Sequence, residues 1–244
     1  MERAEWLKQM QSKAEALYDQ FSPLYWVKFG LGENETHRAY LQKFLERVNP
    51  GGVVLSAGCG AGRYDGLLLD VGNPVVGIDQ SAGMLERARE HFPQVHYEKM
   101  GLQEMAFREE FDGVICMDAM EHISPEDYPH ILRKFQEELK PGGVLYFTMD
   151  STPSIELDAS YERAKAQGLP VVFGEVADQV NVAFEQLQAL GPVPVVPDDL
   201  SDSAVYHFYP SLDQAREWIK QAGLSIEEEG FGSGYHHFVV RKNA

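Results

Sequence analysis

The sequence predicts an α/β fold in which a doubly wound, mostly parallel sheet of seven strands carries helices on both faces. Three observations predict it: short apolar runs alternate with helical segments, a glycine-rich turn follows the first run, and glycines and prolines separate the units. A chain of 244 residues also fits one hydrophobic core. We therefore expect one domain over residues 1–244, with a helical cap at 1–34 and a helical insertion at 150–203, after the fifth strand.

The expected strands are short apolar segments bounded by turn residues. They lie at residues 53–57, 75–78, 95–98, 111–117, 144–149, 224–229 and 235–241. Helical patterns between the first five favour strand–helix–strand units, whose strands run parallel. Only residues 230–234 separate the last two strands, and this glycine-rich stretch is typical of an antiparallel hairpin.

The expected helices follow from apolar residues at helical spacing. They lie at residues 35–48, 64–69, 82–91, 126–139 and 211–222. An earlier helix is expected from Glu2 to Phe21, and Ser22 and Pro23 are expected to break it.

The alternation of strands and helices stops between residues 150 and 203. Ile155–Gln167 and Ala177–Leu190 have helical patterns, and three prolines between residues 191 and 197 favour an extended connector. The core is expected to resume at Val205–Tyr209. We interpret the segment as an insertion that covers the active site.

The charge balance argues against nucleic acids and anionic membranes as partners. The chain has 21 basic and 38 acidic residues, a formal net charge of −17, and no basic run. The first residues lack the apolar segment of a secretory signal and no apolar run is long enough to span a bilayer, so we expect a cytoplasmic protein. Cys59 and Cys116 have no metal-site spacing, and no metal is expected.

A glycine-rich turn after the first strand is the main candidate for a cofactor site. Gly58, Gly60 and Gly62 let the backbone turn sharply and let a ligand approach without a Cβ in the way. The start of the following helix suits a carboxylate or a phosphate. The spacing is GxGxG, and Arg63 stands where the dinucleotide fingerprint GxGxxG has its third glycine. This mismatch argues against a nicotinamide or flavin enzyme.

Asp79 is the second element of the expected cofactor site. It ends the second strand, 21 residues after Gly58, where an acidic side chain is placed to accept hydrogen bonds from ribose hydroxyls. The alternative is that Asp79 caps the helix that starts near Ala82. One carboxylate is able to do both.

Residues 53–63 resemble motif I of the class I S-adenosylmethionine-dependent methyltransferases. The resemblance continues in order through residues 77–85, 100–105, 111–122 and 139–145, and covers about Leu41 to Met149. It implies a Rossmann-like methyltransferase fold, S-adenosyl-L-methionine as the cofactor, and methyl transfer to an acceptor. Because the charge argues against nucleic acid, we expect a small-molecule acceptor.

Two departures from the family pattern leave another function open. The family usually has Asp or Glu where Ser56 lies, and its common aspartate after the third strand is absent, so Gln103 or Glu104 must substitute. Ser56 motivates the alternative that the chain binds S-adenosylmethionine or S-adenosylhomocysteine without transferring a methyl group. A nicotinamide oxidoreductase is a third alternative, which Arg63 opposes.

The glycine turn, the strand ends and the resemblance together give the predicted cofactor-binding residues. These are Ser56, Gly58, Cys59, Gly60, Gly62, Arg63, Asp79, Gln80, Met84, Leu102, Gln103, Met117, Asp118 and Ala119. The resemblance implies that Leu102 and Gln103 flank the adenine. Arg63 is a candidate partner for the cofactor carboxylate, or else forms a surface ion pair.

Methyl transfer needs alignment of two reactants more than it needs a catalytic side chain, so a general base is optional. His122 follows the fourth strand and is the candidate base, with a structural role in its loop as the alternative. The predicted acceptor pocket contains Tyr25, Trp26, His122, His207 and Tyr209. Core packing is the alternative for Tyr25 and Trp26.

Overall fold

The computed structural model describes residues 1–30, 34–151, 154–179 and 204–243. Its helices are α1 (Arg3–Lys28), α2 (Glu35–Leu45), α3 (Asp65–Asp70), α4 (Ala82–His91), α5 (Tyr128–Glu138), α6 (Ser154–Ala166) and α9 (Leu212–Gln221), with short 3-10 turns η1 (Leu102–Glu104) and η2 (Met120–His122). Its strands are β1 (Val54–Ala57), β2 (Val75–Asp79), β3 (His96–Lys99), β4 (Phe111–Cys116), β5 (Leu139–Asp150), β6 (Glu175–Gln179), β7 (Ala204–Phe208), β8 (Leu224–Gly232) and β9 (Tyr235–Lys242).

The central sheet confirms the predicted doubly wound, mostly parallel arrangement. Its seven strands lie in the order β3-β2-β1-β4-β5-β9-β8. The first five are parallel, and β9 runs antiparallel to both β5 and β8. The chain moves outward from β1 to β3 and then returns to the other side of β1 with β4. Ligands of open α/β sheets bind at such a reversal, beyond the carboxyl ends of the strands.

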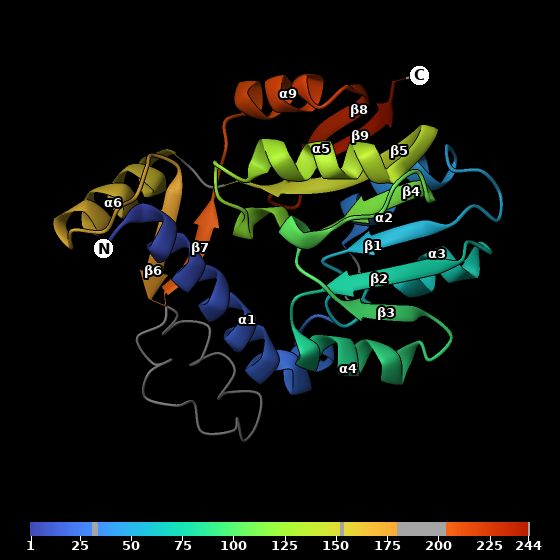
Figure 1. The fold of residues 1–244 in the computed structure, drawn as a ribbon, viewed down its shortest axis with the longest axis horizontal. Helices are drawn as coiled ribbons and strands as arrows, with labels where there is room; N and C mark the ends of the chain where they lie inside the picture. Colours follow the sequence, from blue (N-terminus) through green and yellow to red (C-terminus); the bar gives the residue numbers. More distant parts are fainter. Residues whose placement is uncertain (31–33, 152–153, 180–203, 244) are drawn as a thin grey trace.

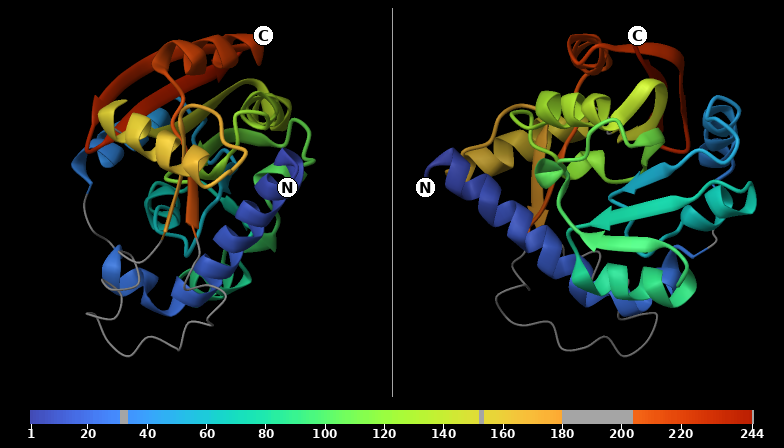
Figure 2. Two further views of the ribbon diagram at one scale, coloured as in Figure 1. Left: turned by 90° about the vertical axis from the view of Figure 1, so that its left-hand side faces the viewer. Right: turned by 45° about the vertical axis from the view of Figure 1, so that its right-hand side comes forward.

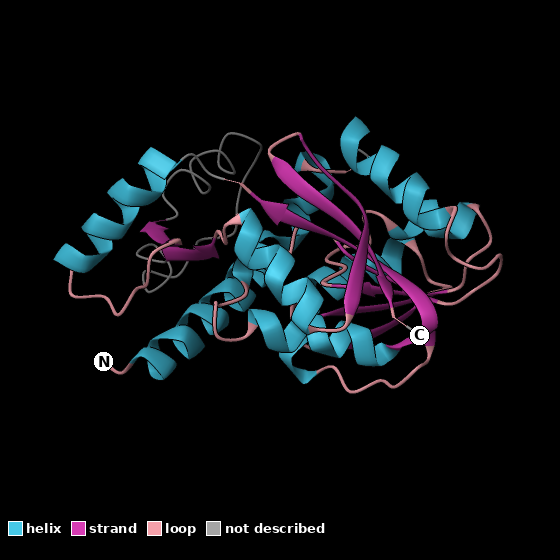
Figure 3. Ribbon diagram, turned by 90° about the horizontal axis from the view of Figure 1, so that it is seen from above, coloured by secondary structure: helices cyan, strands magenta, loops and turns pink. Residues whose placement is uncertain are grey.

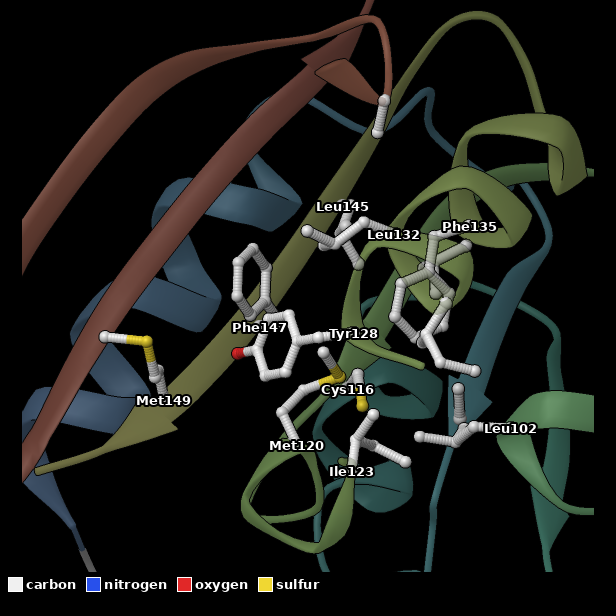
Figure 4. Close-up of a cluster of buried hydrophobic side chains, with 14 of the residues drawn as sticks. Leu102, Cys116, Met120, Ile123, Tyr128, Leu132, Phe135, Leu145, Phe147 and Met149 are labelled. Carbon is white, nitrogen blue, oxygen red and sulfur yellow. The ribbon is translucent and has the colours of Figure 1, made fainter. Parts of the chain in front are cut away.

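Two hydrophobic clusters hold helices on opposite faces of the sheet. Along β5, Leu145 and Phe147 pack against α5 and α9, whereas Val144 and Tyr146 pack against the face that α2, α3 and α4 cover. Figure 4 shows the first cluster, in which Tyr128, Leu132 and Phe135 of α5 lie beside these β5 side chains. Burial on both faces explains why these strands are almost continuously apolar.

α1 does not break at Ser22 and Pro23, so this expectation was wrong. The helix continues to Lys28 with Pro23 inside it. A proline in a helix interior costs about 3 kcal/mol. Contacts on both sides of it hold the helix: Asp19 Oδ1 accepts hydrogen bonds from Ser81 Oγ (2.6 Å) and Gly83 N (2.9 Å), and Trp26 Nε1 donates to the carbonyl of Ala61 (3.2 Å).

The chain after α6 forms a small second sheet where a helix was expected. β6 and β7 pair antiparallel, from Glu175 opposite Phe208 to Gln179 opposite Ala204. The predicted helix at Ala177–Leu190 is therefore wrong for residues 177–179, and its remainder lies outside the described residues, as does the predicted connector. The core does resume within Val205–Tyr209 as expected, because Tyr206 and Phe208 are buried in the first hydrophobic cluster, although β7 pairs with β6 and not with the central sheet. Figure 3 shows the small sheet and α6 set apart from the central strands.

α1 and the β6–β7 sheet lie at the end of the central sheet toward which β2 and β3 point (Figure 1). Figure 2 shows α1 running diagonally across this end of the molecule, and α1 contacts both β7 and α4. This placement puts α1 across the carboxyl ends of the parallel strands. Among the described residues, no helix has the length and apolarity needed to cross a membrane.

Candidate active site

A cavity of about 700 Å³ lies beyond the carboxyl ends of β1, β2 and β4. Its size falls within the range of about 300–1,000 Å³ that small-molecule and cofactor sites occupy. α1 forms one wall with a stripe of residues at helical spacing, among them Leu7, Gln11, Ala14 and Tyr18. The cavity therefore lies between the sheet and the N-terminal helix.

The glycine turn forms the floor of the cavity at the end of β1. Gly58 has φ of +65°, and a Cβ there would lie 2.7 Å from the Cβ of Ala119. Gly60 has φ of +53° and its backbone N–H donates to Asp79 Oδ2 (2.8 Å). Side chains at these positions would be strained, so glycine allows a ligand to lie directly against the backbone.

Asp79 is positioned by backbone donors at the end of β2. Its Oδ2 accepts from Gly60 N, and its Oδ1 accepts from Ser81 N (2.8 Å). Burial raises the pKa of Asp79 to about 6 against these two hydrogen bonds. The cap of α4 is Ser81, whose hydroxyl accepts from Met84 N, so the alternative that Asp79 is the N-cap is wrong.

Ser56 forms a hydrogen bond with a buried carboxyl group that the sequence pattern did not reveal. Asp65 is fully buried, and it accepts hydrogen bonds from Ser56 and from the hydroxyl of Tyr97 (2.7 Å). Burial raises the pKa of Asp65 to about 6 in spite of these donors. A carboxyl group thus lies behind Ser56, where the resemblance leads one to expect an acidic side chain at the strand itself.

Asp118 follows β4 in a left-handed conformation, with φ of +54°. Its Oδ1 accepts from His37 Nε2 (2.8 Å) and its Oδ2 from the Tyr64 hydroxyl (3.0 Å), while its backbone N–H donates to Thr148 Oγ1 (2.8 Å). Arg63 Nη1 lies 3.6 Å from Oδ2. Burial opposes ionisation, but these donors outweigh it, so the pKa of Asp118 lies below its usual value. The contacts hold a backbone conformation that is uncommon outside glycine.

His122 lies in η2 with both ring nitrogens engaged. A carbonyl oxygen only accepts, so Nδ1 carries the proton and donates to Tyr206 O (3.2 Å). Nε2 therefore accepts from the Tyr18 hydroxyl (2.9 Å). Burial lowers the pKa of His122 to about 4, so the ring is neutral at pH 7. His122 thus connects α1, η2 and β7.

Glu121 precedes His122 and is buried against the same cavity, with 7% of its surface exposed. Among the described residues, nothing forms a hydrogen bond with its Oε2. Burial, together with the charges of Asp118 and Asp150, raises the pKa of Glu121 to about 8. The site therefore contains a carboxyl group that is protonated for much of the time at neutral pH.

Most of the predicted site residues line this one cavity. They are Tyr25, Ser56, Gly58, Cys59, Gly60, Arg63, Asp79, Gln80, Met84, Leu102, Gln103, Met117, Asp118, Ala119 and His122. They come from separate parts of the sequence, and the fold brings them together at the strand ends.

Four predicted residues do not line the cavity. Gly62 faces the packed side of the loop, where a Cβ would lie 3.0 Å from the Tyr97 hydroxyl. Trp26 packs against His91, with ring centroids 4.1 Å apart. His207 lies behind His122, and its Nδ1 forms a hydrogen bond with the hydroxyl of Tyr209 (3.1 Å), which also stays outside.

Several residues of the cavity stand outside the predicted cofactor-binding residues and acceptor pocket. Tyr18, Glu121, Tyr206 and Tyr235 all line it. Tyr206 lies one position before the predicted His207, and adjacent residues on a strand face opposite sides. The sequence indicated Glu121 only weakly, because it lies beside His122 within residues 111–122, which resemble a family motif. Tyr18 stands in the aromatic N-terminal segment that is predicted to form the cap, whereas Tyr235 comes from the other end of the chain and no motif or spacing pointed to it.

Comparison with known proteins shows a similarity to methyltransferases over the central part of the chain. Residues 54–143 match the family described as "Methyltransferase domain". A ubiquinone biosynthesis O-methyltransferase of Xanthomonas campestris is 34% identical over 112 residues, which are 43% of this chain and 46% of that protein. The chain spans about half of the length of the curated relatives that it matches.

Two solved structures share the fold. An S-adenosylmethionine-dependent methyltransferase from Mesorhizobium loti has a TM-score of 0.63 and 18% identity, covering 87% of this chain and 100% of that one. The 1,6-didemethyltoxoflavin-N1-methyltransferase of Burkholderia thailandensis, solved with 1,6-didemethyltoxoflavin and S-adenosylhomocysteine bound, has a TM-score of 0.62 and 15% identity, covering 100% and 92%.

The fold is thus the Rossmann-like fold of class I S-adenosylmethionine-dependent methyltransferases. Residues 54–143 are the part of the chain that matches the methyltransferase domain family. These residues run from β1 into β5 and contain the glycine turn, Asp79 and Asp118. The part of the chain that the family covers is therefore the part that forms the floor of the cavity.

Proposed function

We propose that the protein transfers a methyl group from S-adenosylmethionine to a small-molecule acceptor. One observation carries the proposal: Asp79 and the side-chain-free backbone of Gly58 and Gly60 face one cavity at the reversal point of the sheet. The matched relative is named for O-methyl transfer and the structural neighbour for N-methyl transfer, so both kinds of acceptor atom have support. The net charge of −17 supports a small molecule over a nucleic acid.

The residues present fit an adenosyl group. A carboxylate offers about four lone-pair sites, and the backbone takes two at Asp79, which leaves acceptor capacity for two ribose hydroxyls. Met84 and Leu102 provide apolar surface for a base, and Gln103 provides a polar edge. The backbone at Gly58 and Gly60 is open to the methionine portion. Arg63 and Asp118 offer both signs of charge beside it.

When bound, S-adenosylmethionine supplies a methyl group on a positively charged sulfur, which is already activated for transfer. The chain's part is to align the acceptor and exclude water, which contributes up to about 7–11 kcal/mol to lowering the barrier. α1 supports this role, because its stripe of cavity-lining residues ends at Tyr18 and Tyr25 beside the glycine turn and η2. We propose that residues 1–34 act as the cover. No described residue of 150–179 lines the cavity.

The binding-only alternative rests on Ser56. The carboxyl group of Asp65 directly behind Ser56 weakens that argument, because negative charge is still available near the strand end. Methyl transfer therefore remains the function that the site supports best.

Calorimetric titration with S-adenosylmethionine tests the proposal, with Asp79→Ala and Asp70→Ala compared alongside the unmodified protein. Hydrogen bonds to a charged group contribute about 1.5–3 kcal/mol, so Asp79→Ala should weaken binding about 10- to 150-fold. Asp70→Ala, at an exposed position at the end of α3, should bind normally. Equal binding by all three proteins, or none by the unmodified protein, contradicts the proposal.

A further inference from the structure

Glu121 differs from Asp79 and Asp118, the other buried acidic side chains that line the cavity, because its Oε2 has no hydrogen-bond partner among the described residues. His37 and Arg63 face Asp118, and Arg3 donates two hydrogen bonds to the buried carboxylate of Glu175. Glu121 is more than nine-tenths buried and faces the cavity, and its Oε2 accepts no hydrogen bond within the described ranges. Buried polar atoms in native structures normally have partners. Since Glu121 lines the cavity, a molecule bound there is able to supply this partner.

The titratable groups around Glu121 are acidic or neutral. They are Asp118 after β4, Asp150 at the end of β5, Tyr18 on α1, Cys116 on β4, Tyr128 on α5 and Tyr235 on β9. Beside it, η2 packs on β7 through His122 and His207. Burial lowers the pKa of both imidazoles to about 4 and about 3, so they add no positive charge at pH 7. Beside Glu121, a negatively charged acceptor would be repelled by Asp118 and Asp150.

We propose that Glu121 takes the proton from the methyl acceptor, and that the acceptor is an uncharged molecule whose nucleophilic oxygen or nitrogen carries that proton. This inference rests on the proposed function. The acceptor's O–H or N–H donates to Oε2 before the reaction, which satisfies the buried oxygen.

The proton balance of the step is complete with this one carboxylate. The acceptor heteroatom gives a lone pair to the methyl carbon, the electron pair of the broken carbon–sulfur bond stays on sulfur, and the acceptor's proton passes to Glu121. A positive sulfur and a negative carboxylate thus become a neutral thioether and a neutral carboxylic acid. No other reactant is needed.

His122 is less suited to take this proton in the observed arrangement. Its Nε2 already accepts from Tyr18, and its Nδ1 donates to the carbonyl of Tyr206. The low pKa of the ring also makes it a weak proton acceptor. The pKa of Glu121, about 8, is close to the working pH, where a general base is most effective. His122 instead positions η2 between α1 and β7.

The test begins with release of S-adenosylhomocysteine from S-adenosylmethionine in the presence of phenols, alcohols, heterocyclic N–H compounds, thiols and carboxylates. For each acceptor found, kcat and KM are measured for the unmodified protein, Glu121→Gln and Glu138→Gln. Glu138 is the matched control, because burial also raises its pKa to about 8, yet it lies on α5 and does not line the cavity.

Glu121→Gln should lower kcat about 10²- to 10⁴-fold. It should change KM and the calorimetric affinity for S-adenosylhomocysteine by less than about threefold. In the unmodified protein kcat should rise with pH through about 8, as Glu121 loses its proton, and the variant should lose this dependence. Glu138→Gln should match the unmodified protein in all three readouts.

Carbon-13 NMR of glutamate carboxyl groups gives a readout without turnover. Two resonances should titrate near pH 8 in the unmodified protein; Glu121→Gln should lose one of them and Glu138→Gln the other, which assigns each resonance to its residue. If Glu121 titrates near its ordinary value of about 4.3, if Glu121→Gln keeps its kcat, or if only carboxylates are methylated, the inference is overturned. If the unmodified protein shows no turnover, the proposed function is overturned together with the inference. The three outcomes above overturn the inference alone, so the two failures are distinguishable.

Discussion

The two halves of the cavity are built in different ways. The cofactor half consists of the glycine turn, Asp79, Leu102, Gln103 and residues 117–119, which follow successive parallel strands. The acceptor half consists of Tyr18, Glu121, His122, Tyr206 and Tyr235, which come from α1, η2, β7 and β9. The first half is fixed by strand order alone. The second depends on how distant segments pack, so it should be the more easily changed by mutation.

Trp6→Ala should have the largest effect, and mainly on the acceptor half. Trp6 is buried, with 2% exposed, and packs edge-on against Tyr206 of β7 with centroids 5.6 Å apart. Truncating a buried tryptophan costs about 3–5 kcal/mol. We expect that loss in the free energy of unfolding measured with urea, whereas Val27→Ala, on the exposed side of the same helix, should be near neutral. Similar values for the two variants would show that α1 is not anchored through Trp6.

Gly58→Ala should damage the cofactor half. The new Cβ would lie 2.7 Å from Ala119 at a φ of +65°, and this kind of strain costs about 1–3 kcal/mol. Gly72→Ala is the control, since Gly72 also has positive φ but no atom within 4 Å of the added carbon. Thermal denaturation and calorimetry with S-adenosylhomocysteine compare them. Only Gly58→Ala should weaken binding, and intact binding by this variant would contradict the assigned floor of the cavity.

Affinity for S-adenosylhomocysteine should decrease as the pH is lowered, because Asp79 becomes protonated. Ribose hydroxyls donate to the ionised carboxylate, so binding is strongest above its pKa of about 6 and is lost as the pH falls through that value. We expect a decrease of about tenfold between pH 7 and pH 5. Asp79→Asn should bind weakly at both pH values. A parallel decline in that variant would assign the effect to another group, such as Asp65, whose pKa is also raised to about 6.

Tyr18→Phe should have the smallest effect and should leave the cofactor half unchanged. It removes the hydroxyl that donates to His122 Nε2, a bond whose loss costs about 0.5–1.5 kcal/mol. The melting temperature should fall slightly while the affinity for S-adenosylhomocysteine stays the same. A large loss of cofactor affinity would show that the two halves are coupled through α1.

The sequence could predict the cofactor half because its signals are local. Gly58, Gly60 and Asp79 stand at fixed places after consecutive strands, and strand order carries them to one edge. The acceptor half has no such rule. Tyr206 and His207 differ by one position, and which of them enters the cavity depends on the pairing of β7 with β6, a partner that the sequence pattern did not reveal.

Tertiary contacts also explain the error at Pro23. A helix break is the correct local expectation, but Asp19 and Trp26 bind α4 and the glycine turn on either side of it. Asp65 behind Ser56 is a similar case, because its contact with Ser56 forms only when the turn folds back on α3.

The most direct test of the account is a crystal structure of the protein with S-adenosylhomocysteine. We predict that both ribose hydroxyls donate to Asp79, that the amino-acid portion lies against Gly58 and Gly60, and that the sulfur faces the acceptor half beside Glu121. A nucleoside bound elsewhere, with Asp79 contacting only its backbone donors Gly60 and Ser81, would contradict it.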